Sequence, residues 1–458
     1  MKIRLATMTA ILLSIVSIGI THAETIEDEA LQWLTEFIGV DTVNPPGNES
    51  RAVAFYGGLL DREGIPWDSA ESSPGRGNIW ARLEGGDEPA LILIQHTDVV
   101  PADADYWDSD PMKATERDGY LYGRGVLDMK GTGISQFATF VALKRSARSL
   151  NRDVVFVATA DEEAGGAYGA GWLVKHRPEI FQGAGYLLNE GGSGTPVGDT
   201  TVFSVEVTQK VPVWFRLTAI GVPGHGSMPR AENAVNTLMD GIAAIRNNPF
   251  PIRVIAPMDA YFKGLARSME GEQKARYMNM AGALRDVAAQ RKLQEESASH
   301  HALTRDTCTV TRLSASNKIN TVPPVAWAEM DCRMLPDRPS ADLVADINAL
   351  LEGTGVSAEV LMAFTPAVSA TNTVLFDAIR RITSERHPGS YVIPGVTTGF
   401  TDSHFFRDLG ITSYGFDPLV MPSEDEAGFH GNNERLNIGA WKRGVSDTRA
   451  IVEMVVYD

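Results

Sequence analysis

Cysteine is nearly absent from this chain of 458 residues, which contains only Cys308 and Cys332. Two cysteines are too few for a disulfide-rich scaffold. Neither lies beside a histidine or another cysteine at metal-ligand spacing, which argues against thiolate chemistry. The two could pair with each other in an oxidising compartment, and the sequence alone leaves this open.

Long hydrophobic runs are also scarce, and the one that stands out is at the N-terminus. Lys2 and Arg4 precede an apolar run from Leu5 to Ile20, and Thr21-His22-Ala23 follows as a plausible cleavage point. This pattern is typical of a secretory signal peptide. The run is shorter than the roughly 20 residues that a membrane-spanning helix needs. We therefore expect removal of residues 1–23, export to the periplasm or the exterior, and no membrane association afterwards.

Positive charge is in deficit, with 41 Lys and Arg against 58 Asp and Glu and a net charge of −17. An acidic protein repels phosphate backbones, so nucleic-acid binding is not expected. The 43% hydrophobic and 22% charged residues are typical of a soluble globular protein, and the length favours two domains.

Apolar strand-like runs alternate with helical segments in the first half of the chain. The runs cover residues 79–83, 91–95, 154–160 and 186–188, and helical patterns cover residues 131–148 and 169–176. Such alternation predicts an α/β fold with a mainly parallel sheet.

The pattern changes near residue 211, where Val213, Phe215 and Leu217 alternate with other residues as on a half-buried strand. We predict a smaller α+β domain at residues 208–365. It is inserted into an α/β domain that comprises residues 24–207 and 366–458. Residues 261–299 are polar and rich in helix formers, which indicates a helical insertion; His300 and His301 beside it are expected to be exposed to solvent.

Acids and histidines occur in five short segments, most of them where a predicted strand ends, and α/β sheets hold their sites at strand ends. His96 and Asp98 follow the second strand and project to one side, so Asp98 can orient the His96 ring for a metal. A histidine satisfied within a loop is an equally good interpretation of this segment alone. Asp128 lies between glycines before a helix, where a plain helix cap is the simpler interpretation.

Consecutive carboxylates follow the strand at residues 154–160. Glu162 and Glu163 repel each other unless a cation or a proton intervenes, so one can bind a metal while the other serves as a general base. A solvated charge run is the alternative, weakened by the apolar strand before it. For Glu190 the alternative is an acidic residue in a turn, and for His430 it is a histidine in a loop without a metal. Together, two histidines and three carboxylates suit a pair of zinc ions and leave Glu162 free to deprotonate water.

At this point the sequence resembles the metallopeptidase family of aminoacylase, carboxypeptidase G and succinyl-diaminopimelate desuccinylase. The segments that carry the resemblance are His96-Thr97-Asp98-Val99-Val100-Pro101, Gly123-Arg124-Gly125-x-x-Asp128-Met129-Lys130-Gly131 and Asp161-Glu162-Glu163. It covers nearly all of the mature chain. The segments around Trp107, Asp331-Cys332-Arg333 and Thr401-Asp402-Ser403 look closest to the aminoacylase and carboxypeptidase S branch.

The resemblance implies a role for each matching residue. Asp128 would bridge two zinc ions, with His96 and Glu190 on one and Glu163 and His430 on the other; cobalt or manganese could replace zinc. Glu162 would be the general base and then acid, with Asp98 orienting His96. The smaller domain would be a lid that also forms a homodimer. Its His225 would stabilise the tetrahedral intermediate, commonly in the partner subunit's site, and Asn320, Arg333 and Gly399 would hold the substrate. The alternatives without a functional role are that His225 caps a turn and that Arg333 is a surface charge at a strand edge. His404 lies in an acidic, aromatic loop, and the resemblance gives no reason to count it as a ligand.

Three functions remain open at this stage. Hydrolysis of N-acyl amino acids is preferred, because the closest motif matches point to it. A carboxypeptidase or dipeptidase acting on short peptides is the alternative, since both substrates leave a free carboxylate for Arg333. A non-catalytic binding protein of the same fold is a remote third, because such a protein would be expected to have lost a ligand or the base.

Overall fold

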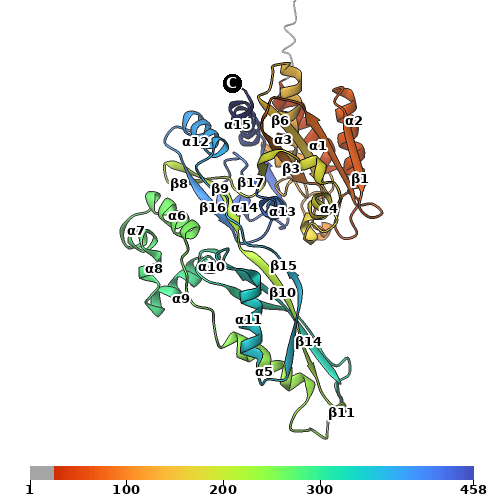
Figure 1. Cartoon of the computed structure of the whole chain (residues 1–458), viewed down its shortest axis with the longest axis vertical. Coiled ribbons are helices and arrows are strands. Elements are labelled where there is room, and N and C mark those ends of the chain that lie inside the picture. The colour runs from red at the N-terminus through yellow and green to blue at the C-terminus, as the bar shows by residue number, and fades with distance from the viewer. Residues whose placement is uncertain (1–24, 458) are drawn as a thin grey trace, which may run out of the picture.

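The computed structural model describes residues 25–457, so the predicted signal peptide at residues 1–23 lies outside the described part of the chain. Two larger sheets, one of nine strands and one of four, organise these residues. The first lies in a broad part of the molecule and the second in a narrow extension below it (Figure 1). No helix within residues 25–457 is both long enough and apolar enough to cross a membrane.

The larger sheet has the order β1-β2-β6-β3-β7-β17-β9-β16, with β8 paired to β9 beside this path. Its strands are β1 (Trp67–Glu71), β2 (Gly77–Leu83), β3 (Glu88–His96), β6 (Arg152–Thr159), β7 (Ala184–Asn189), β8 (Gly194–Val197), β9 (Thr200–Gln209), β16 (Tyr391–Thr397) and β17 (Thr412–Gly415). Strand β3 runs parallel to β6 and β7, β7 to β17, and β9 to β16. The mainly parallel sheet predicted from the sequence is confirmed.

Helices cover both faces of this sheet. They are α1 (Ile26–Ile38), α2 (Ser50–Arg62), α3 (Lys130–Ser146), α4 (Ala170–His176), α12 (Val374–Arg386), α13 (Ser403–Asp408) and α15 (Ile438–Val456). Leu91 and Leu93 of β3 pack with α1, α3 and α15 on one face, whereas Ile92 and Ile94 pack with α4 and α13 on the other. Since successive strand residues point to opposite faces, a sheet covered on both sides needs the continuous apolar run that β3 has.

A third, three-stranded sheet lies beside the larger one and joins β4 (Thr115–Arg117), β5 (Tyr120–Tyr122) and β18 (Arg435–Asn437). Strand β18 pairs with β5, with Arg435 opposite Tyr122. This pairing brings the loop that carries His430 beside the segment that leads to Asp128, although the two are about 300 residues apart.

The smaller sheet is antiparallel, with the order β12-β14-β10-β15. Its strands are β10 (Val211–Ile220), β12 (Thr307–Ser314), β14 (Val325–Met334) and β15 (Val356–Ala363), and helices α5 (Ala234–Arg246) and α11 (Ser340–Leu351) pack against it. A short pair, β11 (Gly224–His225) with β13 (Thr321–Val322), forms the far tip of this part (Figure 1). Cys308 and Cys332 lie opposite each other on β12 and β14 and form a disulfide.

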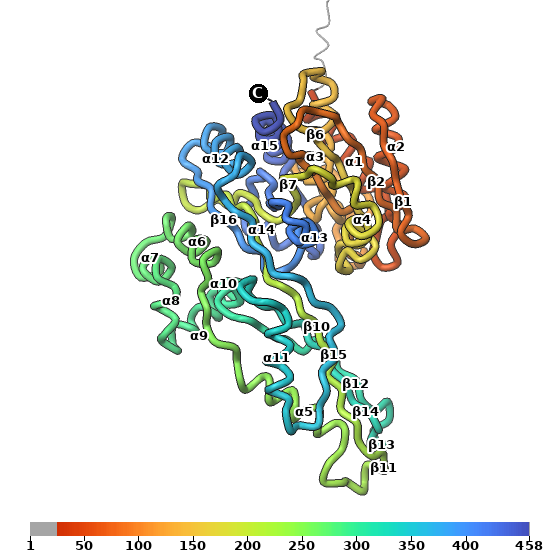
Figure 2. The backbone as a smooth tube through the Cα atoms, viewed as in Figure 1, coloured from red at the N-terminus to blue at the C-terminus, as the bar shows by residue number. Residues whose placement is uncertain are grey.

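The polar stretch after residue 255 is the predicted helical insertion. It forms α6 (Ala256–Leu265), α7 (Gly271–Met278), α8 (Met280–Ala283), α9 (Val287–Glu296) and α10 (Ala298–Ala302) around its own small core. Helix α6 lies against β16 of the larger sheet, where a Cβ atom on Gly264 would come within 2.5 Å of Ile393. The backbone trace shows the same placement, with the insertion alongside the junction of the broad and narrow parts (Figure 2). The shorter elements are η1 (Ala104–Tyr106), η2 (Glu162–Ala164), η3 (Pro178–Phe181), η4 (Ala266–Ser268) and α14 (Ser423–Glu426).

Candidate metal centre

Three adjacent strands of the larger sheet deliver their C-terminal residues to one edge. Strand β3 ends at His96, β7 ends one residue before Glu190, and η2 begins with Glu162 shortly after β6. Because β6, β3 and β7 are parallel neighbours, their carboxyl ends coincide. Asp128 reaches this edge from the segment before α3, and His430 reaches it from the loop before β18.

Five side chains form two groups that share Asp128. In the first, His96 Nε2 lies 3.1 Å from Asp128 Oδ1 and 3.6 Å from Glu190 Oε2. In the second, His430 Nε2 lies 3.0 Å from Asp128 Oδ2 and 3.1 Å from Glu163 Oε2. Each oxygen of Asp128 therefore faces a different histidine, as a carboxylate that bridges two ions does.

The donor set fits metal ions. The ligand atoms of each group lie within 4.8 Å of one another. Ligands at about 2.1 Å around a tetrahedral zinc are roughly 3.4 Å apart, close to the separations of the two histidines from their carboxylate partners. In addition, Glu163 Oε1 is buried and has no hydrogen-bond partner among the described residues. Buried oxygens usually find a donor or a cation, so this atom supports the same interpretation.

Electrostatics within the chain alone also favour a cation. Burial raises the pKa of Glu190 to about 7, and burial with the nearby charge of Glu190 raises the pKa of Glu162 well above its usual range. Hydrogen bonds to Asp128 and Glu163 raise the pKa of His430 to about 10. Without a metal the site thus retains protons, and a cation must displace them to bind.

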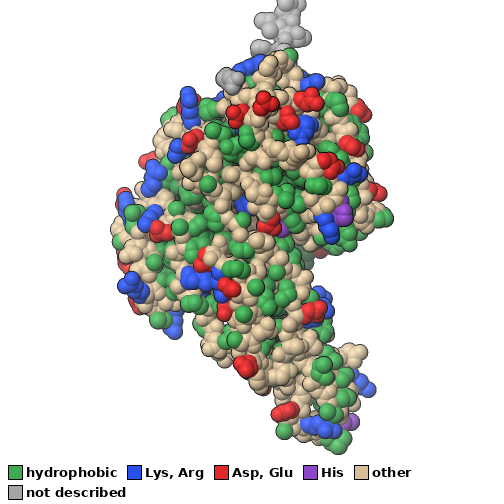
Figure 3. Space-filling model, in the orientation of Figure 1, with side chains coloured by type: hydrophobic (Ala, Val, Ile, Leu, Met, Phe, Trp, Pro, Cys, Tyr) green, Lys and Arg blue, Asp and Glu red, His purple; other side chains and the backbone are tan. Residues whose placement is uncertain are grey.

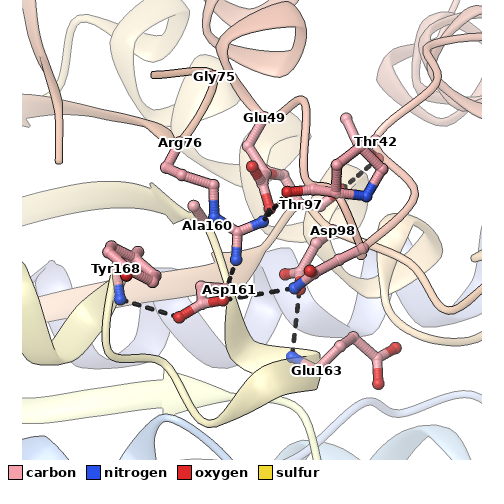
Figure 4. Close-up of polar contacts among 12 residues, drawn as sticks. Thr42, Glu49, Gly75, Arg76, Thr97, Asp98, Ala160, Asp161, Glu163 and Tyr168 are labelled. Carbon is pink, nitrogen blue, oxygen red and sulfur yellow. Dashed lines mark hydrogen bonds and ion pairs between the residues drawn. The ribbon is translucent and has the colours of Figure 1, made fainter. Parts of the chain in front are cut away.

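Asp98 holds two parts of the site together. Its backbone oxygen lies 3.0 Å from His96 Nδ1, and one carboxylate oxygen lies 3.4 Å from the same nitrogen. Its carboxylate also accepts hydrogen bonds from the backbone N–H groups of Glu162 and Glu163 at 3.1 and 3.2 Å. The contact from Asp98 to Glu163 is visible in Figure 4. Asp98 therefore orients the first histidine and fixes the turn that carries the second group's glutamate.

A buried ion-pair cluster supports this turn from behind. Arg76 lies between Glu49 and Asp161 and pairs with both, and Asp161 also accepts from the backbone N–H of Tyr168 (Figure 4). Asp161 has a positive φ of 71°, which is uncommon for a residue other than glycine. Its contacts hold it in that conformation, and Glu162 follows directly.

Glu434 anchors the other side of the site. Its buried carboxylate accepts from the backbone N–H groups of Gly125, Leu127 and Asp128 at 2.9, 2.7 and 3.2 Å, and from Arg124 at 2.7 Å. The loop before α3 is thereby fixed to the loop that carries His430. Glu434 and Arg124 are not among the site residues predicted from the sequence, because neither has a local pattern that reveals its distant partner.

Residues of the two ligand groups line a cavity of about 350 Å³. Glu162, Arg333 and Gly399 line the same cavity. Arg333 projects from β14 of the smaller sheet, where Asp331 accepts from its Nε and Nη2 at 2.7 and 3.1 Å. Its Nη1 is buried and has no hydrogen-bond partner among residues 25–457. Arg333 therefore contributes a positively charged side chain to the lining of the cavity that four of the five ligand candidates also line.

The structure does not bring His225 and Asn320 to this cavity. His225 belongs to β11 at the far tip of the narrow part, where its Nδ1 lies 2.8 Å from Ser227 Oγ (Figure 1). Asn320 lies beside it and accepts from the backbone N–H of Gly226 at 2.9 Å. Both side chains are exposed.

The two ligand groups do not include His300, His301 or His404. The expectation that His300 and His301 are exposed is wrong, because both are partly buried. His300 Nδ1 lies 2.7 Å from the hydroxyl oxygen of Tyr277. Aromatic side chains of α6 and α7 surround it. His404 is buried and stacked on Phe364 at 3.6 Å between ring centroids, and it belongs to neither ligand group.

These features together define an α/β protein with two adjoining candidate metal-ligand groups that share Asp128. A profile of the peptidase family M20/M25/M40 matches residues 92–453, and the chain belongs to this family. It is a hydrolase of amide or peptide bonds.

Relatives and solved structures agree with this assignment. The chain is 29% identical over 370 residues to the N-fatty-acyl-amino acid synthase/hydrolase PM20D1 of Xenopus tropicalis, covering 78% of this chain and 71% of the relative. It is 25% identical to human aminoacylase-1, covering 92% and 93%. The M20 family metallo-carboxypeptidase Sso-CP2 of Sulfolobus solfataricus shares the fold, with a TM-score of 0.74, 19% identity and coverage of 93% and 99%.

The anchoring role of Glu434 leads to a stability prediction. Glu434→Ala would leave Arg124 charged and buried without its partner, so the free energy of unfolding should fall by about 3–5 kcal/mol. Urea denaturation of the metal-free protein measures this. Replacing both residues, as in Arg124→Met with Glu434→Leu, should cost less than Glu434→Ala alone. A loss below about 1 kcal/mol for Glu434→Ala would contradict the anchoring role.

Proposed function

We propose that this protein hydrolyses N-acyl amino acids and uses two zinc ions. The observation that carries the proposal is Arg333, which lines the same cavity as Asp128, Glu163, Glu190 and His430 and whose buried Nη1 has no hydrogen-bond partner among the described residues. A planar guanidinium recognises a carboxylate through two parallel hydrogen bonds. A substrate whose carboxylate meets Arg333 would present the adjacent amide to the metal groups.

Zinc is the proposed metal because the donors are two imidazoles and three carboxylates, a mixed nitrogen and oxygen set. Cobalt or manganese would also accept this set. His96, Asp128 and Glu190 would hold one ion, and Asp128, Glu163 and His430 the other. When bound, such ions lower the pKa of a water and polarise a carbonyl oxygen.

Glu162 has the position for proton transfer. It lines the same cavity as the ligands, and its neighbour Glu163 belongs to the second group. Nearby cations would lower its raised pKa again, because an opposite charge favours the carboxylate. Glu162 takes the proton of the attacking water and then delivers it to the leaving nitrogen.

A carboxypeptidase or dipeptidase acting on short peptides is the second candidate. Arg333 would bind the C-terminal carboxylate of a peptide equally well. The chain is also 27% identical to the probable carboxypeptidase S-like 2 of Dictyostelium discoideum over 376 residues. The two candidates differ in what lies on the acyl side of the bond that is cut.

The assay is hydrolysis of N-acyl amino acids and of dipeptides, each with and without a chelator. Glu162→Ala should lower kcat by about 10²- to 10⁴-fold while metal content stays at two ions per chain. Asp128→Ala should lose both ions, because each group would keep only two protein ligands. Elemental analysis of the purified variants measures the metal.

Asp105→Ala is a matched control, since Asp105 is an exposed acid in η1 that belongs to neither group. It should retain metal and activity. Loss of metal from Glu162→Ala, or full activity in it, contradicts the assignment of the base. Faster turnover of dipeptides than of every N-acyl amino acid would favour the second candidate.

We further propose that the protein is a homodimer in which His225 and Asn320 complete the partner's site. Both residues are exposed at the tip of the narrow part, away from the cavity of their own chain, and this supports the proposal. Large hydrophobic side chains are exposed in the same region, including Ile220, Met228 and Ile319. Figure 3 shows hydrophobic side chains gathered on this tip, as expected of an interaction surface.

Co-expression of two inactive variants tests the shared site. Glu162→Ala and His225→Ala subunits should each be inactive alone. Half of the randomly formed dimers would be mixed, and each mixed dimer would contain one intact site, so about a quarter of wild-type activity should return. Activity in a monomeric fraction, or no recovery in confirmed mixed dimers, would rule out the shared site.

Export is the proposed location, supported by the N-terminal pattern and by the disulfide between Cys308 and Cys332, since disulfides persist in oxidising compartments. N-terminal sequencing of the exported protein should begin at Glu24. Recovery of an intact Met1 from the cell interior would refute export.

A further inference from the structure

The segment of residues 40–44, shortly after helix α1, contains no ligand candidate but runs beside the chain that leaves the end of β3. Thr42 Oγ1 donates a hydrogen bond to the backbone oxygen of Thr97 at 2.6 Å (Figure 4). Val43 forms an isolated parallel bridge with Val99. These contacts fix the backbone on both sides of the acid that lies between Thr97 and Val99.

Asn44 ends this segment, and its side-chain amide lies between two carboxylates. Its Nδ2 donates to Asp98 Oδ2 at 2.8 Å and, with a longer contact of 3.4 Å, to Asp161 Oδ1. All three residues are buried. Because both partners are acceptors, the nitrogen of the amide is the atom that faces them, and it supplies donors without adding a charge.

The hydrogen bond from Asn44 is the shortest that the carboxylate of Asp98 accepts among the described residues. The backbone N–H groups of Glu162 and Glu163 donate to it at 3.1 and 3.2 Å. Oδ2 is shared by Asn44 and Glu163, whereas Oδ1 accepts from Glu162 and lies 3.4 Å from His96 Nδ1. Without Asn44, Oδ2 would keep one longer hydrogen bond, and the carboxylate could turn away from the imidazole.

The segment that supplies Asn44 is also attached to the other side of the site. Lys130, two residues after Asp128, is buried and donates to the backbone oxygens of Phe37 and Val40 at 3.0 and 2.8 Å. The amide of Asn44 is therefore carried by a stretch of chain that is fixed to two of the loops with ligand candidates.

We propose that Asn44 is a positioning residue of the metal centre and raises its metal affinity by fixing the carboxylate of Asp98. This rests on the proposed function, since it requires that the two ligand groups hold metal ions. Asn44 belongs to neither group and acts through Asp98, which orients the His96 ring and accepts from the turn that carries Glu163. Removal of such an outer hydrogen-bond partner typically weakens metal binding by about 10- to 100-fold.

The test is the zinc affinity of the metal-depleted protein, measured by competition with a chromophoric chelator. Asn44→Leu replaces the amide with an apolar side chain of similar size, so the donor is lost and a water has no room to replace it. The Kd for zinc should rise by about 10- to 100-fold. Asn44→Ala leaves space for a bridging water and should raise the Kd less.

Thr42→Val is the matched control. Thr42 is buried in the same segment, but its hydroxyl donates to a backbone oxygen and not to Asp98. Both Thr42→Val and Asn44→Leu should lower the urea midpoint of the metal-free protein, because each removes a buried hydrogen bond. Only Asn44→Leu should change the Kd for zinc.

A double-mutant cycle tests whether Asn44 acts through Asp98. Asp98→Ala should weaken zinc binding by itself. Adding Asn44→Leu to it should weaken binding no further, because the amide then has no carboxylate to position. Effects of the two substitutions that simply add would overturn the proposed role.

The outcomes separate this role from the proposed function. If the wild type binds zinc and Asn44→Leu binds it with the same Kd, or if Thr42→Val raises the Kd as much, the positioning role is wrong and the proposed function stands. If Asn44→Leu does not fold, the same comparisons made with Asn44→Ala decide. A wild-type protein that binds no metal contradicts the proposed function and the positioning role together.

Discussion

Mutual repulsion among carboxylates at one sheet edge is the constraint on which this structure depends. Asp128, Glu163 and Glu190 meet within a few ångströms of two histidines, with Glu162 in the same cavity. A cluster of this kind is unfavourable unless protons or cations compensate its charge. The raised pKa of Glu190 and the raised pKa of His430 are the response of the chain alone, and metal ions are the response that the donor geometry fits.

The surrounding fold supplies the rigidity that such a cluster needs. Asp98 accepts backbone hydrogen bonds from the turn with Glu162 and Glu163, and Arg76 supports that turn through Asp161. Glu434 accepts three backbone N–H groups on the opposite side. Buried acids that are fully hydrogen-bonded hold the ligands in place before any cation arrives, so little reorganisation is needed when one binds.

Local signals in the sequence predicted much of this arrangement. The apolar runs before His96 and Glu162 identify strands buried on both faces. The five ligand candidates were found because each follows a strand or lies in a distinctive short segment. Strand β9 was not predicted because a local signal is missing: only Lys210 separates it from β10, and no turn residue marks the passage between the sheets.

Contacts between distant segments explain the other differences between the sequence-based predictions and the structure. The polar composition around His300 predicted exposure, yet the rings that enclose it come from helices more than 20 residues away. Glu49 and Arg76 are 27 residues apart, and Arg124 and Glu434 are 310 apart. Such pairs are recognised only once the sheet has brought their segments together.

The contacts of Glu434 also have a consequence for biogenesis. His430 and Glu434 come from the end of the chain, whereas the ligands and backbone groups that they complete were synthesised some 300 residues earlier. A polypeptide that ends before residue 430 would contain every strand of the larger sheet but would lack one proposed ligand, the anchor of Asp128 and helix α15. The proposed metal groups are therefore complete only after the C-terminal segment has folded onto the segment before α3.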